Sequence, residues 1–367
     1  MIRPLAAVFL ALSASAAPFL VPSAFAAGLK VAVVAPVEGL LAPLGRQILE
    51  GARFGAEARG TEIVPVTETC EASDAASLKA ALKATGAEAA IGFLCTESLE
   101  AVLPDLGPQA VPAITLSVRS EILMEDALKN GWPFWRLAPT ARMESLRLSE
   151  VILGRWRGEP LALIDDGTIH GREIIDSVRT ALGEIGVTAT FTDTFRPAQD
   201  QQIGLVRRLS RSGATHVLVG GDRSDIAIIA RDAASESVPL TILGGDAMNA
   251  PDQPVPLADG VLAVTRPEPA TLPSAAETVQ SMRAAGLQPD GYVLPAFAAV
   301  SLLEQAKDQA EADGSPLTAA LSKGPYATAL GPIRFDGGHE LAENPFRLME
   351  WRDGRFQPLP APAGNTP

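Results

Sequence analysis

The chain has 367 residues, which is long for a single domain, and its hydrophobic fraction of 47% excludes a disordered chain. With 43 acidic and 30 basic residues, its net charge is −13, which argues against nucleic acid and anionic membrane surfaces as partners. Two cysteines and three histidines leave little material for a metal site, and we expect neither a metal nor a cofactor.

The first segment has the three parts of a secretory signal peptide. Arg3 precedes a long uncharged apolar run, which ends in the small-residue motif Ala24-Phe25-Ala26. A membrane anchor is the alternative, but Pro18 and Pro22 interrupt the helix that an anchor needs. We therefore expect residues 1–26 to be cleaved and the rest of the chain to be exported.

Strands and helices alternate along the exported chain. Short apolar runs rich in β-branched residues predict strands that are buried on both faces, as in parallel sheets. The predicted strands are 30–35, 89–94, 111–115, 161–164, 187–191, 215–219, 241–243 and 260–264. The predicted helices between them are 44–58, 75–85, 141–156, 171–185, 201–212 and 225–235. This alternation predicts doubly wound α/β layers, followed by a proline-rich, disordered tail over 357–367.

Export also bears on the only two cysteines, Cys70 and Cys95. An oxidising compartment favours a disulfide between them, which would close a loop of roughly 25 residues and stabilise the fold by about 3 kcal/mol. The alternative is a pair of buried free thiols. A catalytic thiol is disfavoured, because no histidine lies near either cysteine in the sequence.

Polar residues follow the predicted strands at the point where each strand ends. Two of these ends read Gly220-Gly221-Asp222 and Gly244-Gly245-Asp246. Ligands of open α/β sheets bind beyond the carboxyl ends of the strands, so each aspartate is a candidate ligand contact. The alternative for each is an ordinary turn or helix cap, since aspartate after glycine is common in turns.

No enzyme motif is present in the sequence. It has no G-x-S-x-G elbow, phosphate-binding loop, H-E-x-x-H or C-x-x-C motif, and we expect no enzyme activity. The three histidines are far apart in the sequence. We expect His216 to be a core residue of its strand, His339 to be exposed in a turn, and His170 to line a site or cap a helix.

Six segments, in order, resemble the periplasmic solute-binding proteins of the leucine/isoleucine/valine-binding type, which serve ABC transporters. They are the opening strand 30–35 with its glycine-containing helix, Ile91-Gly92-Phe93-Leu94-Cys95-Thr96, Pro112–Thr115, Phe134–Thr140, Tyr292–Gln305 and Leu330–Gly338. The likeness covers roughly residues 29 to 356. In that family the cysteine of the second segment is disulfide-bonded to one that precedes it.

The resemblance implies a type I periplasmic-binding-protein-like fold. Two doubly wound α/β lobes are then joined by three hinge crossings and close on a ligand. We expect the crossings near 138–139, 265–266 and 331–332. Lobe one would comprise 28–138 and 266–330, and lobe two 139–265 and 332–356.

The family's ligand contacts carry over to individual positions. Thr96 takes the place of a serine that holds the ligand carboxylate, and Ser117 the place of a residue whose backbone contacts the ligand. Arg119 stands where the family has a small hydroxyl residue. An arginine there would bind a carboxylate through two hydrogen bonds, or would turn outward.

The remaining carried-over positions depart from the family pattern. Asp246 takes the place of the carboxylate that pairs with the ligand ammonium. Asp222 and His170 stand where many relatives have tyrosines, so the usual aromatic walls are largely missing. We therefore expect a small amino acid or amino-acid-like compound, held by Thr96 and Arg119 at its acid end and Asp246 at its amine end.

In function, the resemblance implies a monomeric periplasmic receptor that captures a small-molecule ligand and delivers it to the permease of an ABC transporter. The alternative is a sensor of the same fold that acts through a signalling partner. A third hypothesis is a protein of this fold that has lost or changed its ligand, because the aromatic walls of the family's pocket are largely missing.

Overall fold

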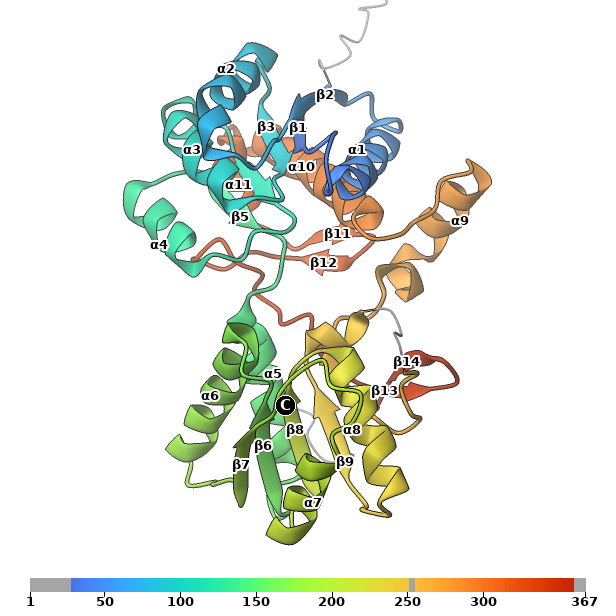
Figure 1. The fold of residues 1–367 in the computed structure, drawn as a ribbon. Coiled ribbons are helices and arrows are strands. Elements are labelled where there is room, and N and C mark those ends of the chain that lie inside the picture. Colours follow the sequence, from blue (N-terminus) through green and yellow to red (C-terminus); the bar gives the residue numbers. More distant parts are fainter. Residues whose placement is uncertain (1–27, 251–254, 360–367) are drawn as a thin grey trace, which may run out of the picture.

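The computed structural model describes residues 28–250 and 255–359. The predicted signal peptide lies outside these residues. The described chain folds into two α/β lobes, one above the other in Figure 1, each built on its own sheet with helices on both faces. The predicted fold class is thereby confirmed. Among the described helices, none combines the length and the apolar character needed to cross a bilayer.

The first lobe is built on a parallel five-stranded sheet in the order β2-β1-β3-β4-β5. Its strands are β1 (Lys30–Ala35), β2 (Glu62–Thr67), β3 (Ala89–Gly92), β4 (Ala113–Thr115) and β5 (Phe134–Arg136). Alternate side chains of β1 enter different cores. Val31 and Val33 pack with the helices of one face, whereas Ala32 and Val34 pack with those of the other.

The helices of this lobe cover both faces of its sheet. On one face lie α1 (Ala42–Ala56), α10 (Val293–Asp313) and α11 (Leu317–Leu321). On the other lie α2 (Ala75–Thr85), α3 (Thr96–Leu106) and α4 (Glu121–Asn130). Helix α9 (Ala276–Ala284) and the small sheet of β11 (Tyr326–Thr328) and β12 (Gly331–Ile333) complete the lobe.

The second lobe is built on a seven-stranded sheet in the order β14-β13-β10-β9-β8-β6-β7. The parallel strands are β6 (Leu161–Asp165), β7 (Phe191–Thr194), β8 (His216–Gly220), β9 (Thr241–Gly244) and β10 (Leu262–Thr265). The hairpin β13 (Arg347–Arg352) and β14 (Arg355–Pro358) adds two antiparallel strands. Helices α5 (Ala141–Arg155) and α6 (Ile169–Glu184) cover one face, and α7 (Ile203–Ser212) and α8 (Arg223–Ser235) the other.

Three sequence predictions differ from the structure at sheet edges. The strand predicted at 187–191 begins only at Phe191, because edge strand β7 alternates between half-buried and exposed residues and has no continuous apolar run. Edge strand β2 was not predicted, since it contains Pro65 and fully buries only Val66. The predicted tail begins too early, because Gln357 and Pro358 belong to β14; its residues from 360 onward lie outside the described part.

The chain crosses between the lobes three times, after β5, after β10 and ahead of β13 (Figure 1). The third crossing was predicted at 331–332, and this position is wrong. Gly331 and Pro332 pair with β11, and Phe335 and Leu341 pack in the core of the first lobe. The crossing therefore follows Leu341, and Phe346 is the first large side chain buried in the second lobe.

Buried ionisable groups lie beside this third crossing. Arg136 is fully buried, and its Nη2 lies 3.3 Å from Glu340 Oε1 and donates to the carbonyl of Ser120. Burial raises the pKa of Glu340 to about 7, although Arg136 opposes the shift. His339 was predicted to be exposed, and this is wrong. Its ring stacks on Trp135 with centroids 4.3 Å apart, and Nδ1 donates to the carbonyl of Phe134.

Candidate functional site

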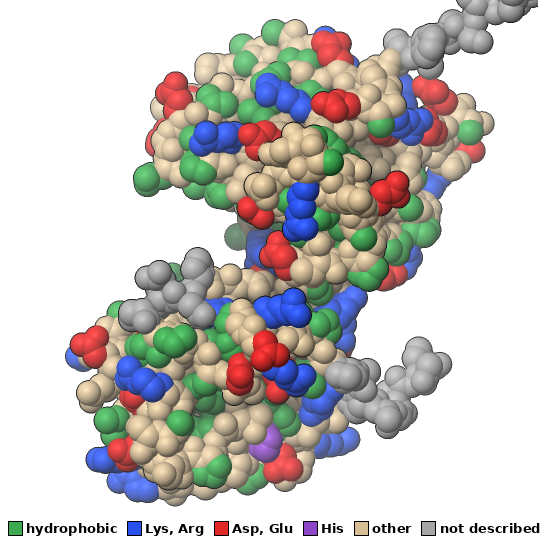
Figure 2. Space-filling view, turned by 90° about the vertical axis from the view of Figure 1, so that its right-hand side faces the viewer, with side chains coloured by type: hydrophobic (Ala, Val, Ile, Leu, Met, Phe, Trp, Pro, Cys, Tyr) green, Lys and Arg blue, Asp and Glu red, His purple; other side chains and the backbone are tan. Residues whose placement is uncertain are grey.

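The carboxyl ends of the parallel strands in the two sheets face each other across the gap between the lobes. Arg119 follows β4 in the first lobe, and Asp246 follows β9 in the second. Their side chains meet, with Arg119 Nη2 3.5 Å from Asp246 Oδ2. The space-filling view shows the lobes separated by an open cleft on one side of the molecule (Figure 2). The candidate site is therefore this cleft, where the loops after the strands of both sheets converge.

Asp246 is the most densely contacted side chain of the site, with only 10% of it exposed. Arg266 Nη2 lies 3.0 Å from its Oδ2, on the oxygen that Arg119 also approaches. Its Oδ1 accepts hydrogen bonds from Thr265 Oγ1 at 3.0 Å, Asn249 Nδ2 at 3.3 Å and the Arg266 backbone N–H at 3.4 Å. The carboxylate is thus already paired inside the protein, mainly with two guanidinium groups.

These contacts set the charge of Asp246. Burial alone would raise its pKa, but the Arg266 ion pair, hydrogen bonds from Arg266 and Thr265, and the nearby Arg119 together hold that pKa below its usual value. Asp246 is therefore ionised at neutral pH, as the partner of the two arginines.

Glu144 lies directly behind Asp246 and was not predicted from the sequence. It is in the first turns of α5 and is fully buried, and its Oε1 accepts the backbone N–H of Asp246 at 2.7 Å. Its Oε2 is buried and has no hydrogen-bond partner among the described residues. Burial raises the pKa of Glu144, and the negative charge of Asp246 adds to the rise. Gly245 makes this approach possible, because a Cβ there would overlap Glu144 Oε1.

The predicted residues of the first lobe divide into two groups. Arg119 turns toward Asp246 of the opposite lobe, and its contact with a ligand stays a prediction. Ser117 Oγ lies 3.0 Å from the hydroxyl of Tyr292, which precedes α10, and its backbone N–H donates to Thr115 Oγ1. Thr96 is the first residue of α3 and is half-buried, and no contact brings it to Arg119 or Ser117.

His170 and Asp222 lie on the second lobe and are exposed. His170 is the second residue of α6 and lies near enough to Glu144 to lower the pKa of that carboxyl. Asp222 occupies the N-cap position of α8 without a side-chain cap hydrogen bond. No hydrogen bond or ion pair joins either residue to Asp246 within the described chain, so their ligand contacts remain predictions.

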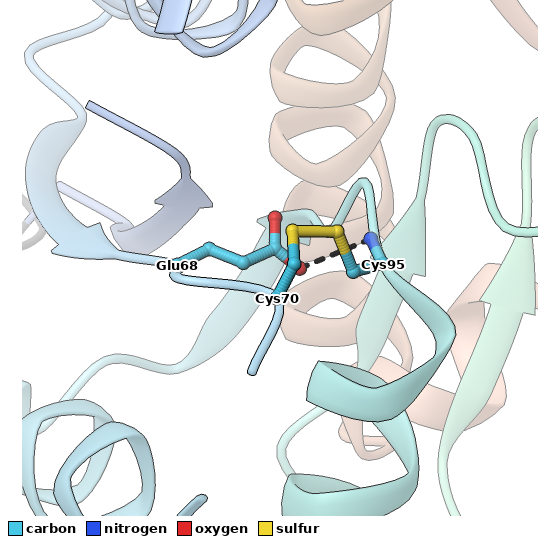
Figure 3. Close-up of side chains that lie close together, drawn as sticks. All are labelled: Glu68, Cys70 and Cys95. Carbon is cyan, nitrogen blue, oxygen red and sulfur yellow. Dashed lines mark hydrogen bonds between the residues drawn. A yellow bond between two sulfur atoms is a disulfide. The ribbon is translucent and has the colours of Figure 1, made fainter. Parts of the chain in front are cut away.

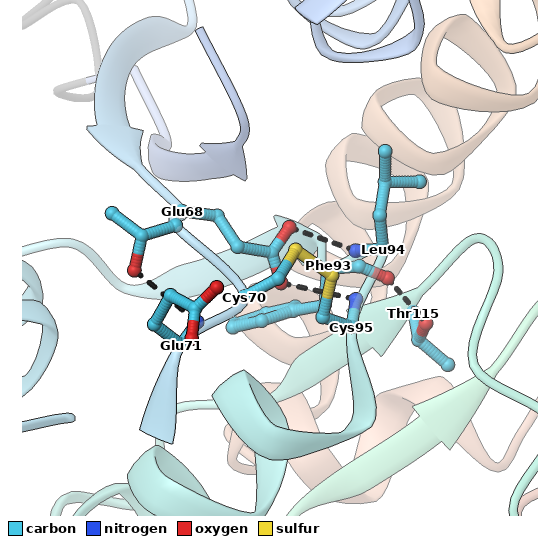
Figure 4. The surroundings of a disulfide bond; sticks show 8 residues. Glu68, Cys70, Glu71, Phe93, Leu94, Cys95 and Thr115 are labelled. Atoms are coloured by element: carbon cyan, nitrogen blue, oxygen red, sulfur yellow. Dashed lines mark hydrogen bonds between the residues drawn. A yellow bond between two sulfur atoms is a disulfide. The ribbon is translucent and has the colours of Figure 1, made fainter. Parts of the chain in front are cut away.

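The predicted disulfide between Cys70 and Cys95 is present, with the Cα atoms 5.4 Å apart. Figure 3 shows the carboxylate of Glu68 beside it, in contact with the backbone of Cys95. Glu68 is buried and accepts the backbone N–H groups of Leu94 and Cys95 at 2.9 and 3.1 Å (Figure 4). The disulfide and Glu68 together fix the turn that leads into α3 and thus the position of Thr96.

Glu68, Cys70 and Cys95 are the one group of potential metal ligands that lie close together among the described residues. The two sulfur atoms are bonded to each other, so neither is a thiolate that could coordinate a metal. The geometry therefore gives no support to a metal site at this position.

Apolar side chains are exposed along the same edges of both lobes. In the first lobe, the loop after β1 exposes Val37 and leaves Leu40 99% accessible, and Ile122 at the start of α4 is 73% accessible. In the second lobe, Ile169 at the start of α6 is 79% accessible. Exposed large apolar side chains at facing edges are typical of surfaces that become covered on binding or closure.

Sequence reasoning missed the residues that complete the Asp246 environment. Arg266 was singled out only as part of a hinge crossing, and its placement directly after a strand was the available signal. Glu144 offered no such signal, because a glutamate in the first turns of a helix is ordinary. Its burial depends on Gly245, which is distant in the sequence.

The comparisons with known proteins agree with this architecture. A family model described as periplasmic binding protein matches residues 28–355. The Leu/Ile/Val-binding protein homolog 2 of Brucella abortus (strain 2308) is 26% identical over 229 residues, which cover 61% of this chain and 62% of that protein. The match thus spans less than two thirds of that relative. The Leu/Ile/Val-binding protein homolog 3 of Brucella melitensis is 22% identical over 91% of this chain and 94% of that protein.

Two solved structures illustrate the likeness of fold. The ABC transporter substrate-binding protein of Desulfitobacterium hafniense in complex with Leu has a TM-score of 0.66 and 18% identity, over 90% of this chain and 100% of that one. A solute-binding protein of an R. palustris ABC transporter in complex with benzoate has a TM-score of 0.62 and 17% identity, over 90% and 95%. At these identities the likeness establishes the fold. Together with the family match over nearly the whole described chain, it shows that the chain belongs to the periplasmic binding protein family.

Proposed function

We propose that the protein is the periplasmic receptor of an ABC transporter. It captures a small carboxylate-bearing solute, an amino acid or a related organic acid, between its two lobes and delivers it to a membrane permease. The observation that carries the proposal is the pairing of Arg119 in the first lobe with Asp246 in the second, because it brings ionic groups of both lobes to one point.

Three further features support this proposal. The matched family model is one of periplasmic binding proteins. Exposed apolar side chains at the cleft edges of both lobes would be buried when the lobes close. Solved structures of the same fold hold leucine and benzoate, two small carboxylates.

The direct test is binding by the exported protein, unfolded and refolded to remove any retained solute. Thermal unfolding is measured against amino acids, amides, polyamines and aliphatic and aromatic acids. A ligand at 100 times its dissociation constant adds about 2.7 kcal/mol to the free energy of unfolding, which raises Tm by a few degrees. Scattering of the liganded protein should show a more compact particle. Failure of every solute to shift Tm would remove the receptor proposal.

Delivery to a permease and a periplasmic, monomeric state are parts of the same proposal. Deletion of the gene should abolish uptake of the identified solute by intact cells, and the protein should fractionate with the periplasm as a monomer. Unchanged uptake, combined with a lost transcriptional or behavioural response to the solute, would instead support a sensor of the same fold.

A further inference from the structure

We infer that the cleft selects an organic carboxylate with an apolar body and no ammonium group. Arg119 and Arg266 are the ligands of the solute carboxylate, and Asp246 is their internal counter-ion. This inference deepens the proposed function and rests on it. It reverses the role that the sequence predicts for Asp246, which is to hold the ammonium of an amino acid.

Asp246 has no room for an ammonium group. Six donor contacts already reach its two oxygens, whereas a carboxylate offers about four lone-pair positions. The donors are Thr265 Oγ1, Asn249 Nδ2, Arg266 N, Arg266 Nε, Arg266 Nη2 and Arg119 Nη2. An incoming ammonium would have to displace a guanidinium, and it would enter a site that already holds two positive charges.

Arg119 and Arg266, by contrast, have N–H donors that make no hydrogen bond within the described residues. Arg119 is 36% exposed, and among the described residues only its Nη2 makes a polar contact. Arg266 is 43% exposed and uses Nε and Nη2, so that Nη1 has no partner in the described chain. Both guanidiniums converge on Asp246 Oδ2 from different elements. A carboxylate placed beside them would accept charge-assisted hydrogen bonds from both.

Glu144 and Asp222 do not replace Asp246 as an ammonium acceptor. Glu144 is fully buried behind the backbone of Gly245 and Asp246, and its Oε1 already accepts the Asp246 N–H. Its unpartnered Oε2 is also inaccessible to solvent, so a solute would reach it only if this backbone moved. Asp222 is exposed at the N-cap of α8 and has no contact with the arginines.

The exposed apolar side chains at the cleft edges indicate that the solute has an apolar body. Val37, Leu40 and Ile122 are exposed on the first lobe, and Ile169 is exposed on the second. Covering such side chains with an apolar solute is favourable by the hydrophobic effect, whereas a second charged group on the solute would need a partner here. The chemistry of the site therefore matches a branched aliphatic or aromatic monocarboxylate.

The test compares solutes that share one carbon skeleton. Calorimetry on the refolded protein uses leucine, 4-methylpentanoate and isopentylamine as one set, and phenylalanine, 3-phenylpropanoate and 2-phenylethylamine as another. Benzoate and 4-hydroxybenzoate extend the panel. We expect the best ligand to be an acid without an amine, at least about tenfold tighter than its amino-acid counterpart, with no binding of the amines.

Variants test the roles of the charged groups by the sign of their effects. Arg119→Gln and Arg266→Gln should each weaken carboxylate binding by about tenfold or more, because each removes a charge-assisted hydrogen bond. Asp246→Asn should leave this affinity unchanged or raise it, because it removes the competing counter-ion. Arg172→Gln is the control on the same lobe, because its guanidinium pairs with Asp165, and it should not change the affinity.

The opposite results would overturn the inference. An amino acid that binds as tightly as its deaminated counterpart, or an Asp246→Asn variant that loses affinity while retaining its wild-type fold by circular dichroism, restores Asp246 as an ammonium partner. In either case the receptor proposal stands. If no solute of any class binds, the inference and the receptor proposal fall together, so the two failures are distinguishable.

Discussion

Arg119 Nη2 lies 3.5 Å from Asp246 Oδ2, although the two residues are 127 positions apart and belong to different lobes. This ion pair couples the two lobes electrostatically. Because Asp246 is also bound to Arg266 at the second hinge crossing, one carboxylate connects both lobes and the hinge.

Removal of this ion pair should have a small effect on stability and a larger effect on how widely the lobes open. Arg119→Gln should change the free energy of unfolding by about 1 kcal/mol or less, because the pair is partly exposed. The ligand-free variant should nevertheless sample wider openings, seen as a larger radius of gyration in solution scattering. Arg172→Gln is the matched control, because the Arg172 side chain is 62% exposed and its guanidinium lies beside Asp165. Identical scattering of Arg119→Gln and the wild type would contradict the coupling.

Gly245 should be intolerant of any side chain. Gly245→Ala places a Cβ against Glu144 Oε1, which is buried and bound to the Asp246 N–H, so we expect a loss of roughly 1–3 kcal/mol of unfolding free energy. Gly183→Ala is the control, because that position lies near the end of helix α6 with open space around its Cβ. It should be neutral or stabilising by up to about 1 kcal/mol. Urea unfolding of both variants measures the difference.

Glu340 gives the protein a specific dependence of stability on pH. Its pKa in the folded state is about 7, above the value of 4.5 for an unperturbed glutamate, so the folded state holds this proton more tightly. The resulting stabilisation is fully present below pH 4.5 and is lost as the pH rises through about 7. Thermal unfolding between pH 5 and 8 should therefore show Tm falling more steeply in the wild type than in Glu340→Gln.

The difference in Tm between the wild type and Glu340→Gln separates the effect of Glu340 from the effects of its neighbours. Glu144, with a raised pKa, acts in the same direction, and His339, with a lowered pKa, acts in the opposite direction at acidic pH. Both are present in the wild type and in the variant. Parallel Tm curves for the two proteins would show that Glu340 titrates normally in the folded state.

The disulfide should contribute measurably to stability. It closes a loop between residues 25 positions apart, and in the chain-entropy model such a crosslink stabilises the fold by about 3 kcal/mol. The Cys70→Ser/Cys95→Ser double variant should lose roughly this amount in urea unfolding. Wild type unfolded with a reducing agent present should match the variant, while the variant itself should not respond to the reductant. Equal stabilities of oxidised wild type and variant would contradict the prediction.

The regular core of the fold could be predicted because it depends on local patterns. Runs such as Val31–Ala35 are apolar on both faces, and only a strand covered on two sides buries them. The same reasoning did not locate the edge strands correctly. Strand β7 alternates between half-buried and exposed residues, and β2 contains a proline, so neither has the continuous apolar pattern. The third crossing was misplaced because Phe335 and Leu341 pack back onto the first lobe.

The sequence by itself determined that this is a two-lobed α/β binding protein, and it placed Arg119 and Asp246 at the ends of strands where a ligand would lie. Only the tertiary structure decided what those side chains do there. Glu144, Arg266 and Arg119 reach Asp246 from separate elements, two of them more than 100 residues away. Electrostatic interactions depend on distance in space and on burial, so the state of a carboxylate is decided by neighbours that folding brings to it.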